Sequence, residues 1–184
     1  SRSPALTRRR VVVTGLGAIS PVGNTVAEAW DAITNGRSGI GEITRFDTSS
    51  FPVKIAGEVR NFDVGAYLSP KEARRMDKFI HYGLAAGVQA FRDSGLEVNE
   101  ANAHRIGVNI GSGIGGLPMI EDTHDDFLAG GARKISPFFI PGTIINMISG
   151  NLSIMLGLKG PNIAVVTACT TGIHAIGMSA RMIE

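Results

Sequence analysis

The single cysteine of this chain, Cys169, lies in the stretch NIAVVTACTTGIHAIG, where an apolar run gives way to small residues and glycine. If a strand ends before this cysteine and a helix begins just after it, the thiol lies among backbone N–H groups at the positive end of the helix. That setting favours the nucleophilic thiolate, and the same N–H groups can hold the oxyanion of an attacked thioester or ester. The position therefore suits covalent acyl transfer. The simpler alternative is a buried cysteine that only fills space.

His174 is the nearest candidate for a catalytic base. On a helix it lies about 140° around the axis and about 7.5 Å along it from Cys169, so it is poorly placed to take the thiol proton. No other histidine lies at the end of a predicted strand near this turn. We therefore expect the base and the proton donors to come from elsewhere.

A second glycine-rich segment, residues 111–116, matches the dinucleotide pattern G-x-G-x-x-G and follows a predicted strand. A nucleotide site also needs a helix that opens at the third glycine and an acidic residue after the next strand. Pro118 follows closely, and the stretch KISPFF stands where the acid is expected. The first glycine turn, residues 15–20, is followed at once by Pro21. Nucleotide binding stays an alternative, but close packing of the turns explains these glycines more simply.

Basic residues recur at helical spacing in one part of the chain. Their positions i, i+3, i+4 and i+7 place them in one stripe along a predicted helix: Lys71, Arg74, Arg75 and Lys78. Such a stripe is usually solvated surface, but it can also hold an anionic partner reversibly and with strong salt dependence. The sequence by itself leaves both interpretations open.

Composition limits the function classes. The net charge of +2 gives no strong field for nucleic acid, and no apolar run is long enough to span a membrane. A single cysteine suits a reducing compartment, so we expect a cytoplasmic protein. The acidic group around His124 (Glu121, Asp122, Asp125 and Asp126) has no metal-ligand spacing. We expect it to be a solvated helix face, with no metal and no cofactor.

These residues need strands and helices to position them. Apolar runs that end in glycine or small-residue turns begin at residues 10, 105 and 163 and predict strands buried on both faces. Capping signals and glycine stops predict helices over 25–34, 69–94, 119–128 and 141–156, with a short strand over 54–59. This alternation indicates an α/β fold. Residues 1–8 are expected to be a disordered or processed tail, and residues 9–184 a single domain.

The end of the chain lacks a helix stop. Residues 173–184 form a helical run without a glycine or proline after it, so we expect a chain truncated within the helix that follows Cys169. A helix cut there exposes apolar surface, which predicts poor solubility of the isolated piece.

Several long motifs occur in a familiar order: VVVTGLGAISPVGNTVAEAW, SGIGEITRFDTSSFPVKIAGEV, RRMDKFIHYGLAAGVQA, IGVNIGSGIGGL, KISPFFIP and GLKGPNIAVVTACTTGIHAIG. Together they resemble the bacterial β-ketoacyl-[acyl-carrier-protein] synthases, elongating condensing enzymes of fatty acid synthesis, in their type II form. The resemblance implies a thiolase-like α/β/α/β/α layered fold built from two similar halves. This chain would cover most of the N-terminal half of a homodimeric enzyme.

The resemblance also implies roles for particular residues. Cys169 would be the acyl-accepting nucleophile at the start of a buried helix, with its own backbone N–H in the oxyanion hole. Gly113, Ile114 and Phe139 would lie at the acyl-chain pocket. Two histidines and a lysine that assist decarboxylative condensation in the family would lie beyond Glu184, so we expect this piece by itself to be inactive.

The implied partner is acyl carrier protein, in its acyl and malonyl forms, docked on Lys71, Arg74 and Arg75. One alternative is a non-catalytic partner subunit of a condensing complex. Such subunits typically lack the cysteine, so the motif TACTTG argues against it. The other alternative, a nucleotide-binding module, predicts ligand binding that survives loss of the thiol.

Overall fold

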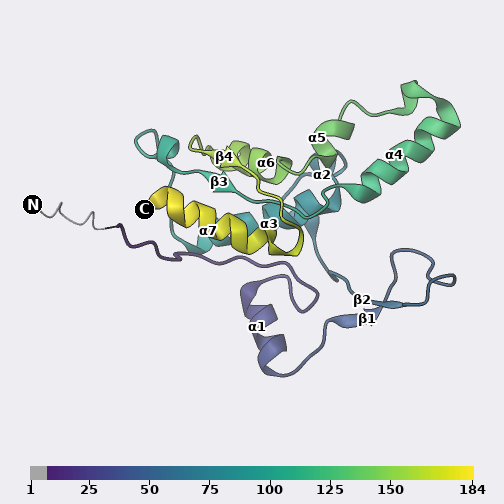
Figure 1. The fold of residues 1–184 in the computed structure, drawn as a ribbon, viewed down its shortest axis with the longest axis horizontal. Coiled ribbons are helices and arrows are strands. Elements are labelled where there is room, and N and C mark those ends of the chain that lie inside the picture. Colours follow the sequence, from purple (N-terminus) through teal and green to yellow (C-terminus); the bar gives the residue numbers. More distant parts are fainter. Residues whose placement is uncertain (1–7) are drawn as a thin grey trace, which may run out of the picture. The chain divides into compact units, whose positions relative to one another are not determined.

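The computed structural model describes residues 8–184, which form short strands and longer helices (Figure 1). The helices are α1 Val26–Thr34, α2 Pro70–Ala73, α3 Lys78–Asp93, α4 Leu117–Gly130, α5 Phe139–Thr143, α6 Met147–Leu156 and α7 Thr171–Ile183. The strands are β1 Ile40–Glu42, β2 Ile55–Gly57, β3 Val108–Asn109 and β4 Asn162–Ile163. Single 3-10 turns cover Val64–Ala66, Ala103–Arg105, Ala132–Lys134 and Ala168–Thr170.

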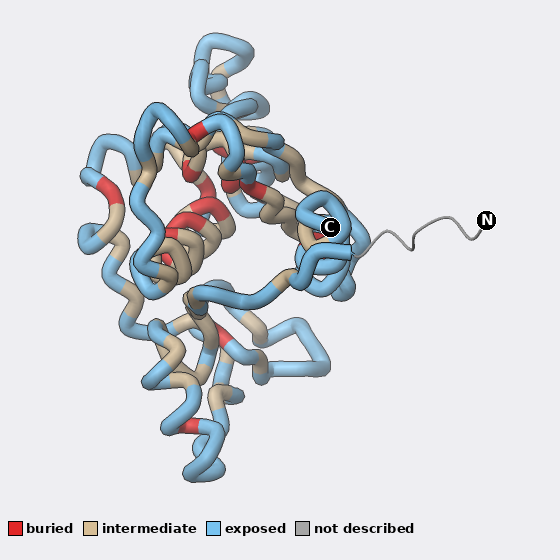
Figure 2. Tube along the Cα trace, turned by 90° about the vertical axis from the view of Figure 1, so that its left-hand side faces the viewer, coloured by how far each residue is buried: buried red, intermediate tan, exposed pale blue. Residues whose placement is uncertain are grey.

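The chain divides into two compact units. The first holds the described part of residues 1–14 together with 75–80 and 97–184, and the second holds residues 15–74 and 81–96. Figure 2 shows that buried residues are sparse along the chain and that most of the trace is exposed or intermediate.

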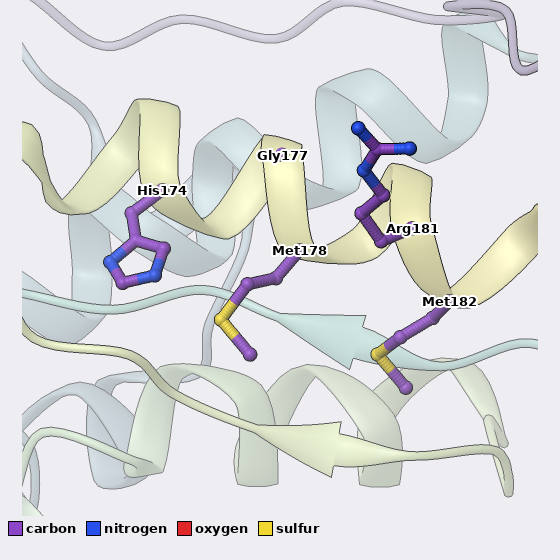
Figure 3. A pocket seen from close by; sticks show the side chains of 5 residues that line it. All are labelled: His174, Gly177, Met178, Arg181 and Met182. Atoms are coloured by element: carbon purple, nitrogen blue, oxygen red, sulfur yellow. The ribbon is translucent and has the colours of Figure 1, made fainter.

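The first unit is built on a parallel pair of strands. β3 pairs with β4, so that Val108 lies beside Asn162 and Asn109 beside Ile163. In Figures 1 and 3 the pair lies between α6 and α7, in agreement with the contacts of both helices. The buried Ser149 hydroxyl of α6 accepts from the backbone of Ile110 at 2.9 Å and donates to the carbonyl of Ile163 at 2.8 Å. One side chain thus ties both strand segments to α6.

The predicted strand near residue 10 is wrong. Residues 10–14 form no strand, and Val12 and Val13 are 64% and 75% exposed. A strand buried on both faces needs neighbours that satisfy its backbone groups, and no strand among residues 8–184 pairs with this segment. The strand predicted to begin at residue 163 is likewise short, because β4 ends at Ile163 and the apolar residues after it form no strand.

The second unit confirms the predicted first helix. Thr25 Oγ1 accepts from the Glu28 N–H at 3.2 Å, and the Glu28 carboxylate accepts from the Asn24 N–H at 2.7 Å. This reciprocal capping starts α1, and Gly36, with a φ of +67°, follows its end. The predicted short strand over 54–59 is also confirmed, as β2, which pairs antiparallel with β1.

The single helix predicted over 69–94 is wrong, because the chain breaks between α2 and α3. The capping box of Ser69 and Glu72 starts α2 as predicted. The buried Asp77 then interrupts the helix. Its carboxylate accepts from the N–H of Phe79 at 3.3 Å and of Met119 at 2.9 Å, and its own N–H donates to the Gly142 carbonyl at 3.0 Å. The four basic residues therefore do not form one stripe along one helix.

Two other helix predictions need correction. The helix predicted over 141–156 is two helices, α5 and α6, and Pro141 lies inside the first of them. The helix predicted over 119–128 is longer, because α4 begins at Leu117 with Pro118 in its first turn, where proline costs no hydrogen bond.

Candidate functional site

Cys169 lies in the 3-10 turn Ala168–Thr170, and α7 begins at Thr171. The residue before it, Ala168, has a φ of +52°, in the left-handed region that residues with a Cβ rarely adopt. Since the turn leads directly into the helix, the thiol lies near the N-terminus of α7, as the sequence predicted. The positive end of a helix favours a negatively charged group at this point.

Cys169 is exposed, which corrects two expectations. It is not a buried thiol, and the helix that follows it is mostly exposed in this chain. Thr171 and Ala175 are the buried residues of α7, whereas Ile173 and Ile176 are 80% and 68% exposed. Val11, Val12 and Val13 lie beside Ile176 and line a hollow with it, but they leave most of its side chain exposed.

Hydroxyl groups hold the turn that carries Cys169. Thr171 Oγ1 accepts from the Thr167 N–H at 2.9 Å and donates to the Ala168 carbonyl at 2.7 Å. Thr170 Oγ1 donates to the Thr167 carbonyl at 2.7 Å. His174 Nδ1 lies 3.3 Å from Thr167 Oγ1, so its ring contacts the turn on the side of Thr167. Sequence reasoning missed these contacts.

The first part of the glycine-rich segment, Gly111 and Gly113, packs against this turn. A Cβ on Gly111 would overlap the Val165 carbonyl and press on the Thr171 methyl group, and one on Gly113 would lie 3.7 Å from the Ala168 carbonyl. The structure therefore brings Gly113 next to the residue before Cys169. Close packing, the simpler explanation of these glycines, accounts for Gly111.

The two predicted apolar pocket residues differ in their exposure. Ile114 is 70% exposed and Phe139 is half-buried at the start of α5. Among residues 8–184, no hydrogen bond or ring contact joins either of them to the turn.

The predicted docking residues differ in their surroundings. Lys71 and Arg74 are exposed, in α2 and at its end. Arg75 is half-buried, and its guanidinium carbon lies 4.0 Å from the centre of the Phe138 ring. This cation–π contact holds the side chain in place while leaving its charge intact.

The start of α4 argues against a nucleotide site. α4 does open directly after the third glycine of the pattern, so Pro118 is no obstacle to the helix. The Asp77 carboxylate, however, accepts from the Met119 N–H in the first turn of α4. A negative charge already lies where a nucleotide phosphate would bind.

A shallow, open apolar groove of about 490 Å³ lies along α7 (Figure 3). It is lined by His174, Gly177, Met178, Arg181 and Met182. Sequence reasoning did not single it out, although three of these residues recur at intervals of four, which places them on one face of a helix. Figure 3 shows the side chains of Met178 and Met182 side by side along α7.

Residues 8–184 contain neither a metal-binding cluster nor a membrane-spanning helix. No group of three histidine, cysteine, aspartate or glutamate residues there is arranged to hold a metal ion, the acidic residues of α4 included. None of the helices in that range has the length and apolar character needed to cross a membrane.

Comparisons with known proteins identify relatives of this chain. Residues 8–184 match the family described as beta-ketoacyl synthase, N-terminal domain. The 3-oxoacyl-[acyl-carrier-protein] synthase 2 of Vibrio cholerae is 62% identical over 178 residues, which are 97% of this chain and 43% of that protein. The enzyme of the same name from Staphylococcus aureus strain COL is 47% identical over 176 residues, 96% of this chain and 42% of that protein. The chain thus spans less than half the length of these relatives.

Solved structures agree with the fold. A beta-ketoacyl synthase from Burkholderia phymatum superposes with a TM-score of 0.80 at 26% identity, over 96% of this chain and 44% of that one. The ishigamide ketosynthase/chain length factor gives a TM-score of 0.76 at 29% identity, over 94% of this chain and 45% of that one. A type II polyketide synthase ketosynthase, solved in complex with its acyl-carrier protein, gives 0.75 at 26% identity, over 96% and 47%. The expected thiolase-like α/β fold is confirmed.

Proposed function

The chain belongs to the beta-ketoacyl synthase N-terminal domain family, and we propose that it supplies the acyl-accepting half of an elongating β-ketoacyl-[acyl-carrier-protein] synthase of type II. The observation that carries the proposal is the exposed Cys169, presented from a left-handed turn at the start of α7. The high identity to synthases of this name supports the substrate class.

In the proposed reaction, Cys169 Sγ attacks the carbonyl carbon of an acyl thioester carried by acyl carrier protein. The new C–S bond forms as the carrier thiol leaves, and the acyl group stays on the enzyme. Malonyl-carrier protein then loses CO₂, and its carbanion attacks the acyl carbonyl. This releases Cys169 and forms β-ketoacyl-carrier protein. N–H groups of the turn, including that of Cys169, stabilise the oxyanion of each attack.

The acyl chain needs apolar walls, which stabilise it by about 0.8 kcal/mol for each buried CH₂. We propose that Ile114 and Phe139 provide them and that Gly113 leaves room for the chain beside the turn. Because Ile114 is 70% exposed in this chain, the pocket requires a further covering surface. A second copy in a homodimer supplies it in this proposal.

We propose acyl carrier protein as the partner, docked on Lys71, Arg74 and Arg75. Two of these side chains are exposed, and the third is held by Phe138 with its charge available. Positive side chains favour reversible, salt-sensitive contact with an acidic protein. A structurally similar ketosynthase has been solved with its acyl-carrier protein, which supports this choice.

We propose that the other catalytic residues and the cover of α7 come from outside this chain. Two histidines and a lysine of a longer protein would assist decarboxylation, and the longer protein would cover the apolar face of α7. The chain accounts for 43% of a relative such as the Vibrio cholerae enzyme, which leaves room for such a second half. The reaction needs no metal or cofactor, and we place it in the cytoplasm.

The test is the intact mass of the full-length protein after incubation with an acyl-carrier-protein thioester. We expect the mass of one acyl group on the wild type and none on Cys169→Ser. The serine hydroxyl is much less acidic than the cysteine thiol and is therefore a much weaker nucleophile. Thr143→Val, a substitution in α5, controls for general damage and should still be acylated. An unmodified wild type would contradict the proposal and favour the non-catalytic partner subunit.

A further inference from the structure

The turn before Cys169 contains a backbone conformation that its own residue does not favour. Ala168 has a φ of +52°, and a Cβ in the left-handed region lies too close to the following carbonyl. Glycine would adopt this conformation freely, but the chain has alanine here. A conformation of this kind persists only where the surroundings hold it, so the structure must contain the groups that do so.

Thr171 is the residue that contacts the backbone on both sides of Ala168. Its hydroxyl accepts from the N–H of Thr167, just before Ala168, and donates to the carbonyl of Ala168 itself. The two distances are 2.9 Å and 2.7 Å, so both hydrogen bonds are well formed. The hydroxyl therefore holds the chain entering Ala168 and, together with the Thr171 backbone N–H, the chain leaving it.

The position of this hydroxyl is itself fixed. Thr171 is 6% exposed, and it opens α7, which restricts its backbone. Its methyl group packs where a Cβ on Gly111 would collide with it, so the glycine leaves room for the threonine. A β-branched side chain held in this way has little rotational freedom.

The other side-chain contacts of the turn lie on the Thr167 side of Ala168, and on the other side the backbone N–H of Thr171 also donates to the Ala168 carbonyl. Thr170 donates to the Thr167 carbonyl, and His174 contacts the Thr167 hydroxyl. Neither touches the backbone of Ala168. Thr171 is thus distinguished from its neighbours by contacts on both sides of Ala168.

We infer that Thr171 is a positioning residue for acyl transfer: its hydroxyl holds Ala168 in the left-handed conformation and so sets the direction in which Cys169 presents its thiol. Thr171 does not touch the reacting atoms and acts through Ala168. The expected effect of Thr171 on acyl transfer rests on the proposed function. Its expected effect on the alkylation rate of the Cys169 thiol does not.

The test uses the full-length protein with Thr171→Val, which keeps the shape and the methyl packing but removes the hydroxyl. Thr171→Ser is the conservative rescue, since it keeps the hydroxyl. Thr143→Val is the matched control, because Thr143 is also a buried threonine whose hydroxyl donates to a backbone carbonyl, that of Phe139 at 2.8 Å. The readouts are the rate of Cys169 alkylation by iodoacetamide across a pH series and the rate of acylation by a carrier-protein thioester.

We expect Thr171→Val to slow both reactions by about 10- to 100-fold and to move the pH midpoint of alkylation, because a small misplacement of a reacting group has effects of this size. Thr171→Ser should stay near the wild type. Thr143→Val should lose comparable thermal stability and keep the wild-type rates and pH midpoint. Wild-type alkylation by Thr171→Val, or equal slowing by Thr143→Val, would overturn the inference.

A further variant covers the case in which Thr171→Val does not fold. Ala168→Gly combined with Thr171→Val should fold and regain reactivity, because glycine adopts the left-handed conformation without the hydroxyl. A double variant that also fails to fold would overturn the inference. If the wild type is alkylated in a Thr171-dependent way but never acylated, only the proposed function fails. If it is acylated and Thr171→Val reacts equally fast, only the inference fails.

Discussion

Helices α3 and α7 both carry apolar residues at helical spacing, but they differ in how far these residues are covered. In α3, Ile80 and Leu84 are completely buried. In α7, Ile173 and Ile176 are 80% and 68% exposed, and a shallow apolar groove runs along another side of the helix. An apolar pattern therefore shows which face of a helix needs a partner, but not whether the same chain supplies that partner.

The two helices also begin differently. α3 starts behind Asp77, whose hydrogen bonds reach Met119 and Gly142, far away in sequence. α7 starts behind a turn held by its own neighbours within four residues. The start of α3 therefore depends on tertiary structure, whereas the start of α7 is held by local hydrogen bonds. The apolar side chains Ile173 and Ile176 of α7 nevertheless stay exposed.

The largest expected difference is in the cost of removing an apolar side chain from each helix. In this 184-residue chain, Leu84→Ala should lower the free energy of unfolding by about 2–5 kcal/mol, because it leaves a cavity. Ile176→Ala should change it by less than about 0.5 kcal/mol, as for an exposed residue. Urea unfolding followed by circular dichroism measures both. In the full-length protein we expect the cost of Ile176→Ala to rise, since the proposed second half covers α7. An equally low cost there would contradict that part of the proposal.

An intermediate effect is expected at the start of α3. Asp77→Ala should lower the free energy of unfolding by about 1–3 kcal/mol, because it removes a helix cap and leaves two backbone N–H groups without their partner. Asp63→Ala is the matched control: the exposed Asp63 side chain accepts from one N–H, that of Gly65 at 2.9 Å. It should cost less than Asp77→Ala in the same thermal or urea unfolding experiment. Equal costs would mean that burial of the Asp77 carboxylate adds nothing to the start of α3.

The smallest effect concerns the buried carboxylate of Glu58. Unlike the exposed apolar side chains of α7, it finds its partners within this chain. Burial by itself raises the pKa of Glu58, but hydrogen bonds from Thr44 and the Arg45 backbone, with the Arg45 charge, bring this pKa below its ordinary value of 4.5. A lowered folded-state pKa stabilises the protein above the ordinary pKa, and this contribution is lost as the pH falls through the lower folded value.

Unfolding of Glu58→Gln at about pH 6 and about pH 3.5 tests this sign. The wild type should lose more stability than the variant between the two conditions. A variant whose urea midpoint falls by as much as that of the wild type would show that Glu58 does not contribute to the acid sensitivity.

Local signals in the sequence predicted much of the fold. Thr25 with Glu28, and Ser69 with Glu72, identified two helix starts, because a capping box joins residues three apart and depends little on the rest of the chain. The same reasoning missed the break before α3 and the unpaired segment at Val12. Both depend on neighbours that are distant in sequence: Met119 and Gly142 in the first case, and a pairing strand in the second.

The long motifs of the sequence resembled the family, and residue types at short spacing by themselves determined the α/β class and the place of Cys169 at the start of a helix. The left-handed conformation of Ala168 is held locally by Thr171, but alanine does not favour it, so the residue types did not predict it. Tertiary structure decided that Gly113 lies beside this turn and that Ile173 and Ile176 of α7 are exposed. Strain and burial depend on what surrounds a residue in space, and that becomes known only when the chain is folded.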